Sequence, residues 1–389
     1  MASILNREWT RMDANGRECS LGKKMAGQRD EAGGYLEALQ RGWGLWGDWA
    51  PTADLWFWGC LGVLEAVEAW AGLVGGLPMG CIYVSGVHVT PEQIQHCSRS
   101  MKIGFHTDAF NSAYWSFDRC LEWAEVQGVH FIECGLIDGV SWIHGLGYQP
   151  HVALYEDPVL LRRKMEGRGV RFSQVDAAFP LSGVDGPLRG VPYVMKSIAW
   201  AAQVGCPCVD TTDGLHAPEG LGEVEAMGMM RRSYRQIMEV AEAHGVTVNI
   251  EPHGYFTTNP DAMEEMLGFC DSPFLRMNLD TGNTFIAGRD PVEFLRRFLP
   301  RVSHVHVKDV SESLAAAVRG GQTGIAVSHC ALGGGVNAGN IRECLKVLRD
   351  AGYGGVLSIE CEGQSGPMIE QSLQWLRKTL KDLGIVETR

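Results

Sequence analysis

The sequence predicts an α/β protein, a closed (β/α)8 barrel over residues 101–385 that follows an N-terminal extension of uncertain structure. The first indication is the period, because short β-rich apolar runs alternate eight times with longer helical runs from Met101 onward. The second is length, since eight units in this span match the roughly 250 residues typical of such a barrel. The third is glycine where helices should end in the left-handed conformation, at Gly128, Gly169, Gly205, Gly245 and Gly352.

The predicted strands and helices follow one another in strict alternation. The strands are expected at 102–106, 130–134, 170–175, 208–211, 246–251, 274–280, 302–307 and 355–360. The helices are expected at 116–127, 158–168, 188–204, 227–244, 260–267, 291–299, 338–350 and 366–383. A doubly wound open sheet is the rival fold, but it favours a glycine-rich phosphate loop after an early strand, and no such motif occurs there.

Composition narrows the class of protein. Hydrophobic residues make up 45% and charged residues 21% of the chain, which is typical of a soluble globular protein with a sizeable core. A net charge of −12 without a basic run argues against a nucleic-acid partner. The most apolar N-terminal stretch, 55–89, is interrupted by charged residues, glycines and a proline, so no membrane span is expected. Twelve scattered cysteines and the lack of a secretory leader favour reduced thiols in a cytoplasmic protein.

Residues 1–100 differ from the rest of the chain. Seven of the twelve tryptophans precede residue 100, and glycine is dense there without a strand or helix period. One interpretation is a disordered extension or a misassigned upstream start, because Met101 directly precedes the first predicted strand. The other is a docking segment with tryptophan anchors, which contacts a small partner subunit or a second copy of the chain.

Four consecutive predicted strands carry ionisable residues at their carboxyl ends, where barrels of this type form active sites. These residues are Glu251, Asp280, His306 and Glu360. One strand-end carboxylate is more often a helix cap or an ion-pair partner, but four such residues in succession favour a metal site. Three carboxylates and one imidazole predict Mn²⁺, with Mg²⁺ or Co²⁺ as alternatives. Two open coordination positions would suit the hydroxyl and carbonyl oxygens of a sugar, whose enolate the metal stabilises.

Other polar residues near these strand ends are candidates for catalysis. His253 shares a face with Glu251 if the strand stays extended, which suits a general acid or base, although a loop hydrogen bond is the alternative. Lys308 lies on the face of His306 and is expected to contact substrate oxygens or to form a salt bridge. His304, one layer deeper on the same face, is expected to pack or to support the ligands.

Earlier strands supply candidates for substrate binding. His106 and Glu133 close the first two strands, and weaker candidates follow the third and fourth at Asp176, Asp210 and Asp213. Cys361 should point away from the pocket by strand alternation. The loop 333–337, Gly-Gly-Gly-Val-Asn, is expected to be a flexible segment that covers substrate, or only a connection.

Several motifs resemble the xylose-isomerase-like TIM barrel superfamily of sugar isomerases, epimerases and related endonucleases. They are Ile-Glu-Pro-His-Gly at 250–254, Leu-Asp-Thr-Gly-Asn at 279–283, His-Val-His-Val-Lys-Asp at 304–309 and Leu-Ser-Ile-Glu at 357–360, with the loop 333–337. The resemblance covers about 101–385. In tagatose and psicose 3-epimerases the equivalent Glu, Asp, His and Glu bind the metal. By this resemblance Glu251 and Glu360 would also move the proton.

Two departures from the epimerase pattern widen the range of reactions. Asn283 replaces the histidine of the epimerases, and its motif is similar to the inosose dehydratase branch, so we expect Asn283 to bind substrate. His253 is absent from the epimerases. The C-terminal half is similar to barrel subunits of enzymes that cleave 3-keto C-glycosides, in which a base removes the proton beside the ketone and the aglycone leaves by β-elimination.

The sequence therefore predicts a divalent-metal-dependent sugar isomerase or epimerase that abstracts a proton alpha to a carbonyl. The first alternative is a lyase or dehydratase that acts on a 3-keto-glycoside by β-elimination. An endonuclease-type hydrolase would need more histidines and a basic groove, which this sequence lacks. The last alternative is a catalytically silent barrel that binds a sugar or a partner.

Overall fold

We analysed a computed structural model of the chain. It describes residues 11–12, 18–19, 82–84, 87–89, 99–138, 150–321, 324, 326–362 and 366–389. The chain divides into two units, Met1–Gly80 and Cys81–Arg389. Two short antiparallel pairs precede the barrel: β1 (Arg11–Met12) with β2 (Glu18–Cys19), and β3 (Ile82–Val84) with β4 (Val87–Val89). The predictions for the remainder of 1–98 lie outside the described residues.

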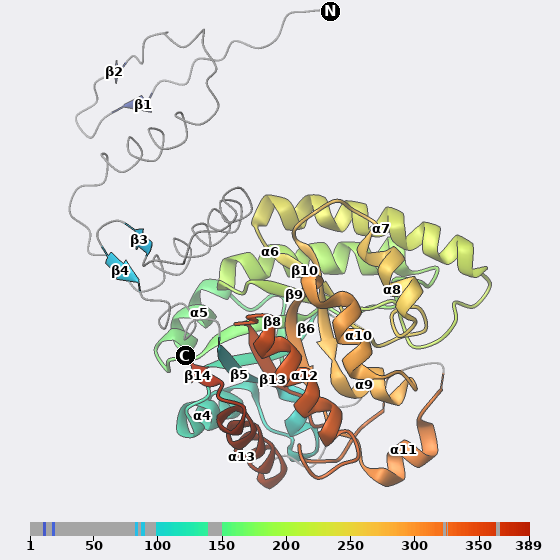
Figure 1. Ribbon diagram of the computed structural model, residues 1–389. Helices are drawn as coiled ribbons and strands as arrows, with labels where there is room; N and C mark the ends of the chain where they lie inside the picture. Colours follow the sequence, from blue (N-terminus) through green and yellow to red (C-terminus); the bar gives the residue numbers. More distant parts are fainter. Residues whose placement is uncertain are drawn as a thin grey trace, which may run out of the picture. The chain divides into compact units, whose positions relative to one another are not determined.

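Eight parallel strands close into a barrel (Figure 1). They are β5 (Ser100–His106), β6 (Phe131–Ile137), β8 (Arg171–Asp176), β9 (Cys208–Thr211), β10 (Thr247–Ile250), β11 (Leu275–Asp280), β12 (Val302–Val307) and β13 (Val356–Ile359). The barrel closes because β5 pairs with both β13 and β6. The predicted eight-stranded barrel is thus confirmed. Two further short strands were not predicted: β7 (His151–Ala153) pairs with β6, and β14 (Val386–Thr388) pairs with β5.

The predicted helices surround this barrel. They are α4 (Phe117–Gln127), α5 (Pro158–Glu166), α6 (Val191–Val204), α7 (Glu223–His244), α8 (Pro260–Leu267), α10 (Pro291–Phe298), α12 (Ala338–Asp350) and α13 (Pro367–Asp382). Side chains such as Ser116, Asp157 and Asp290 accept first-turn N–H groups and so fix where helices begin. All five glycines singled out in the sequence have positive φ, between 65° and 82°. No helix among the described residues is long and apolar enough to cross a membrane.

Short helical segments in the loops were not predicted. They are η2 (Thr107–Ala113), η4 (Gly186–Gly190), α9 (Thr281–Ile286), η5 (Leu299–Arg301) and α11 (Glu312–Val318). They are too short to show a helical period, and tertiary contacts stabilise them. One of them, α9, starts immediately after β11 and presents its first backbone N–H groups to the carboxylate of Asp280.

A layer of buried polar side chains crosses the middle of the barrel. Gln174 on β8 donates to Glu133 Oε1 on β6 at 2.8 Å and accepts from Asn249 Nδ2 on β10 at 2.5 Å. On β12, the Nδ1 atom of His304 lies 3.2 Å from Asn278 Oδ1 and its Nε2 atom lies 3.2 Å from a serine hydroxyl on β8. These side chains are paired because a buried polar group without a partner is costly. His304 is therefore packed within the barrel, as expected.

Candidate metal and active site

The four predicted metal ligands meet at the carboxyl ends of four neighbouring strands. Glu251 directly follows β10, Asp280 ends β11, His306 lies in β12 and Glu360 directly follows β13. Each offers one ligand atom, and these atoms lie within 4.8 Å of one another. The side chain of Glu360 is 12% exposed and those of the other three are less exposed. Strand register thus brings together residues that are up to 109 positions apart in the chain.

The ring of His306 has a different partner on each side. Its Nδ1 atom lies 3.1 Å from Glu251 Oε1, 3.4 Å from Glu360 Oε2 and 3.8 Å from Asp280 Oδ2. Its Nε2 atom lies 2.8 Å from Glu133 Oε2. Burial lowers the pKa of His306, but the charges of Glu133, Glu360 and Glu251 outweigh it and raise that pKa well above its usual value. The Nδ1 atom therefore faces the three carboxylates of the cluster, and the Nε2 atom faces Glu133.

Two carboxylate oxygens in this cluster lack a hydrogen-bond donor. Asp280 Oδ2 and Glu360 Oε2 are buried and accept no hydrogen bond from the part of the chain that the structure describes. Burial and the charge of Glu360 raise the pKa of Asp280 well above its usual value. Burial also acts against ionisation of Glu360, but Lys308 and His306 hold the pKa of Glu360 well below its usual value.

A cation bound by Asp280 Oδ2 and Glu360 Oε2 would give both oxygens a partner, which a buried charge requires. The donor set of three carboxylates and one imidazole nitrogen is the kind that divalent ions with oxygen preference bind. The residues present therefore fit a divalent metal. Glu251, Asp280, Glu360 and the Nδ1 atom of His306 are the groups that would hold it.

Asn283 contacts the ligand set directly. Its Nδ2 atom donates to Glu251 Oε1 at 3.1 Å, and its backbone N–H donates to Asp280 Oδ1 at 2.8 Å. The N–H of Gly282 donates to the same Asp280 oxygen at 2.6 Å. Asp280 is thus the N-cap of α9, which leaves its other oxygen directed at the cluster. Asn283 orients two ligands in this geometry.

Lys308 lies beside the cluster and is almost completely buried. Its side chain runs along Gly282, where a Cβ atom would lie 2.4 Å from Lys308 Cγ. The ammonium group donates to Glu362 and lies 3.7 Å from Glu360 Oε2. Burial acts against its charge, but these two glutamates raise the pKa of Lys308 well above its usual value. The salt bridge considered from the sequence is therefore present, next to a predicted metal ligand.

The predicted role of His253 assumed an extended strand. In the structure His253 lies in the loop after β10 instead. β10 ends at Ile250, and the N–H groups of His253 and Gly254 each donate to Thr257 Oγ1 at 2.9 Å. That hydroxyl donates in turn to Asp213 Oδ1 at 2.7 Å. The loop replaces the strand because Thr257 and Asp213 supply the hydrogen bonds that a neighbouring strand would otherwise provide. Burial lowers the pKa of His253, while the charges of Glu251 and Glu360 oppose this shift.

Glu133 lies below the cluster and has no surface for a substrate. Its oxygens accept hydrogen bonds from Gln174 and Ser358 and lie against the ring of His306, and its side chain is fully buried. Burial acts against its charge, but His306 and His304 lower the pKa of Glu133. The expected contact between Glu133 and substrate stays without support, because β6 continues to Ile137 and leaves Glu133 inside the barrel, where its side chain is fully buried.

His106 lies next to Glu360 at the edge of the cluster. Together with Asp108, the two residues offer ligand atoms within 4.8 Å of one another. The Nδ1 atom of His106 is 3.1 Å from Asp108 Oδ1. Burial lowers the pKa of His106, but Asp108, Glu133 and Glu360 outweigh it and raise that pKa to about 10. This position remains compatible with a substrate-binding role.

The weaker candidates have different surroundings. Asp176 is partly exposed, and its pKa is raised to about 7, mainly by burial, against the opposing effects of His106 and of the N–H of Ala178. Asp210 is buried, and burial and the charge of Glu251 raise its pKa well above the usual value. Asp213 is the loop anchor described above, and it also accepts the N–H of Phe256 at 2.6 Å.

Asp309 had no predicted role, yet its carboxylate anchors the loop 333–337. It accepts the N–H groups of Gly333, Gly335 and Asn337 at 2.9 to 3.0 Å, and that of Val310 at 2.8 Å. The loop is therefore fixed to the end of β12, which corrects the expectation of a flexible segment. The glycines at 333 and 335 were the sequence feature that could have indicated this close contact. A Cβ at Gly335 would lie 2.4 Å from Asp309 Oδ1.

Cys361 follows the predicted alternation, and Glu362, which had no predicted role, lies next to it. Glu362 shares the face of Glu360 and pairs with Lys308, a contact that this spacing of two could have indicated. Cys361 points the other way, where Ser372 Oγ of α13 lies 3.6 Å from its sulfur. The cysteine is therefore directed away from the cluster, as expected.

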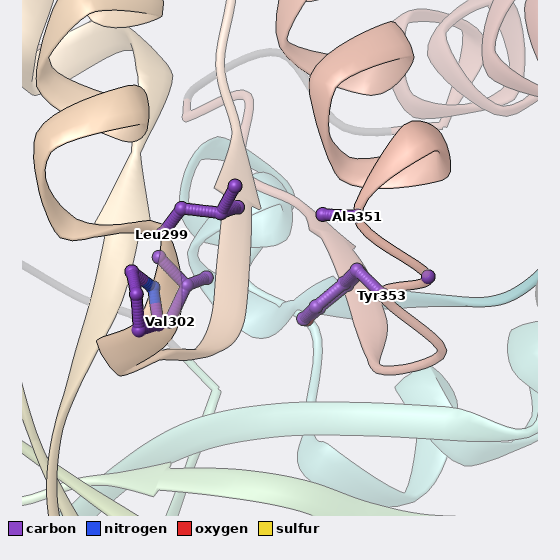
Figure 2. Close-up of a pocket in the computed structure, with 6 residues that line it drawn as sticks. Leu299, Val302, Ala351 and Tyr353 are labelled. Carbon is purple, nitrogen blue, oxygen red and sulfur yellow. The ribbon is translucent and has the colours of Figure 1, made fainter. Parts of the chain in front are cut away.

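A separate pocket lies at the other end of the strands. It has a volume of about 350 Å³ and is lined by Leu299, Pro300, Val302, Ala351, Gly352 and Tyr353 (Figure 2). Val302 begins β12, and the segment of Tyr353 precedes β13. The pocket contains no carboxylate or imidazole, so it belongs to the amino ends of the strands and not to the predicted metal site.

The fold and the site together define a (β/α)8 barrel with an oxygen-rich cluster at the carboxyl ends of its strands. Residues 106–379 match the family described as Xylose isomerase-like TIM barrel, and the chain belongs to this family. Among curated proteins, it is 22% identical over 174 residues to an inosose dehydratase from Bacillus thuringiensis, across 41% of this chain and 58% of the relative. An inosose dehydratase from Clostridium botulinum is also 22% identical, across 40% and 52% of the two chains. The chain thus spans somewhat more than half the length of these relatives.

Solved structures share the fold. A D-tagatose 3-epimerase-like protein is 20% identical with a TM-score of 0.58, across 73% of this chain and 98% of the other. The IOLI protein, whose structure was solved with a bound zinc atom, is 16% identical with a TM-score of 0.55, across 73% and 98% of the two chains. At these identities, the likeness supports the barrel architecture.

Proposed function

We propose that this barrel is a divalent-metal-dependent enzyme that removes a proton alpha to the carbonyl of a keto-sugar, with isomerisation or epimerisation as the outcome. The observation that carries the proposal is the cluster of Glu251, Asp280, His306 and Glu360, which has two buried carboxylate oxygens without a donor. When bound there, a divalent metal supplies positive charge that stabilises a developing oxyanion. Mn²⁺ is our first candidate for this ion, and Mg²⁺ and Co²⁺ are the alternatives.

Glu251 and Glu360 are the groups we assign to proton transfer. Both follow their strands at the mouth of the barrel, and both belong to the cluster. Glu251 Oε1 is held by Asn283 and lies near His306, while Glu360 is held ionised beside Lys308. An ionised carboxylate fixed in this way can accept a proton, and a second one across the substrate can return it. Lys308 would support this step by keeping Glu360 ionised.

Elimination is the second candidate, and the inosose dehydratase relatives favour it. The first step is the same proton removal, and the outcome then depends on whether a hydroxyl or aglycone beta to the carbonyl can leave. His253, two residues after Glu251 in the chain, is our candidate for the general acid or base that exchanges a proton with the leaving oxygen. On a 3-keto-glycoside the same step would release the aglycone.

The test is deuterium incorporation from D₂O, followed by mass spectrometry, with full-length protein loaded with Mn²⁺. D-Fructose and a 3-keto-glucoside would be compared as substrates. Glu251→Gln should lower incorporation by about 10² to 10⁴-fold, the range typical of a lost general base. Glu166→Gln is the matched control, because Glu166 lies on the exposed face of α5, where it pairs with Arg162. Metal binding without any incorporation would favour a sugar-binding barrel without activity.

A further inference from the structure

The carboxyl-end face of the barrel is poor in basic side chains. The eight segments that follow the barrel strands contain only these lysines and arginines in the sequence: Arg189, Arg289, Lys308 and Arg319. Three of them are engaged away from the cluster. Arg189 pairs with Asp185, Arg289 donates to the carbonyl of Thr258, and Arg319 lies over the ring of Phe285.

Lys308 is the remaining one of these lysines and arginines, and it is already paired. Among the residues that the structure describes, it is the only lysine or arginine with a buried side chain. Its ammonium donates to Glu362 and lies 3.7 Å from Glu360 Oε2. Beyond the four predicted ligands, Asp108, Asp176, Asp210 and Glu362 add further acidic groups around the cluster. Two glutamates of the chain thus balance the charge of Lys308, which is not free for an anionic substrate.

Several backbone donors in the described part of the loop after the seventh strand are also occupied. In (β/α)8 barrels a phosphate commonly binds the loops after the seventh and eighth strands, through backbone N–H groups. Here the seventh strand is β12, and the loop that follows it donates N–H groups of Gly333, Gly335 and Asn337 to the carboxylate of Asp309. The N–H of Ser328 donates to Glu362 Oε2 at 3.1 Å. In the described part of this loop, two carboxylates of the chain thus occupy four backbone donors.

We infer that the substrate is an uncharged keto-sugar, without a phosphate or carboxylate group, and that Asp309 and Glu362 exclude anionic analogues. This inference rests on the proposed function and specifies its substrate class. A phosphate that approached this loop would meet two buried carboxylates instead of free donors, and buried charges are little screened by salt. Selection against a competitor by repulsion is an established route to specificity.

The experiment compares matched pairs with the full-length, Mn²⁺-loaded protein: D-fructose with D-fructose 6-phosphate, and D-ribulose with D-ribulose 5-phosphate. Deuterium incorporation from D₂O gives kcat/KM, and calorimetric titration gives Kd. We expect kcat/KM to be at least about tenfold higher for the neutral member of a pair, which corresponds to about 1.4 kcal/mol. Equal or faster exchange of the phosphorylated member would overturn the inference.

Binding separates this inference from the proposed function. If neither member exchanges but the neutral sugar binds more tightly, the proposed reaction fails and the substrate class stands. Tighter binding of the phosphorylated sugar would overturn the substrate class, and absence of both binding and exchange would overturn both claims.

A variant tests whether Glu362 contributes to the preference for uncharged sugars. Glu362→Gln should reduce the preference for neutral sugars several-fold, because it removes one carboxylate and frees the ammonium of Lys308. Glu166→Gln should leave the preference unchanged, and an unchanged preference in Glu362→Gln would contradict the role of Glu362.

Discussion

The Nε2 atom of His306 lies 2.8 Å from Oε2 of Glu133, on the side of the ring opposite the three carboxylates of the cluster. A histidine ligand is commonly fixed in this way by a carboxylate, which selects its tautomer and orients the ring. Glu133 thus keeps a proton on Nε2 and leaves Nδ1 available to a metal. The side chain of Glu133 is itself held by Gln174 and Ser358.

Glu133→Gln should therefore weaken Mn²⁺ binding by about 10 to 100-fold, the usual effect of losing a partner of a histidine ligand. The amide cannot satisfy Gln174, Ser358 and His306 together, because one of its ends is a donor. Calorimetric titration of the metal-free protein with Mn²⁺ measures this change. Glu166→Gln is the control for loss of one charge. An unchanged affinity in Glu133→Gln would show that the contact with His306 does not support the site.

Asp309→Asn should lower the free energy of unfolding by about 1 to 3 kcal/mol, because buried N–H groups lose acceptors. Urea unfolding measures the loss, and hydrogen exchange should show faster opening of 333–337. The matched control is Asp290→Asn. Asp290 caps the exposed start of α10 through the N–H groups of Val292 and Glu293, and Asn caps a helix about as well as Asp. Equal effects of the two substitutions would contradict the role given to Asp309 as an anchor.

Gly254→Ala should disrupt the loop that carries His253, because the new Cβ would lie 1.6 Å from the carbonyl oxygen of Gly214 and 2.3 Å from Asp213 Oδ1. The loop must move, so both the thermal midpoint and the deuterium incorporation should fall. Gly339→Ala is the comparison, since nothing lies within 4 Å of its added Cβ in α12. That change should stabilise the protein by up to about 1 kcal/mol. A tolerated Gly254→Ala would show that the loop is not closely packed there.

The raised pKa of Asp176 leads to a predicted pH dependence of the free energy of unfolding. Its pKa is raised to about 7 in the folded state, mainly by burial, so the folded protein holds a proton that the unfolded chain releases near its ordinary pKa of about 3.9. Stability should therefore fall as pH rises from about 4 to about 7, with no further loss above that range. Asp176→Asn should remove this contribution. Its stability relative to wild type, measured by urea unfolding, should rise across the same interval and then level off. A difference that does not vary with pH would contradict the shift.

The repeating pattern of the sequence was sufficient to predict the barrel, and strand ends were sufficient to predict the cluster. Each strand is a local apolar run, and the end of each strand lies at the same edge of the sheet in any parallel barrel. The candidate ligands Glu251, Asp280, His306 and Glu360 could therefore be predicted to lie together without knowing strand register.

The remaining features depend on register and on contacts between distant segments. Glu133 also closes a predicted strand, but β6 continues to Ile137, so Glu133 lies inside the barrel against Nε2 of His306. The turn at His253 depends on Asp213, 40 residues earlier in the chain. The role of Asp309 depends on a loop that begins 24 residues later. Sequence spacing does not report such contacts.

The most direct test of the account is the number of Mn²⁺ ions that the metal-free protein binds, measured from the electron paramagnetic resonance signal of free Mn²⁺. We predict one tightly bound ion per chain in the wild type and in Glu166→Gln. Asp280→Asn and His306→Ala should lose this tight binding while circular dichroism shows that the barrel is retained. Tight binding that persists in both variants would contradict a metal site built from these four residues.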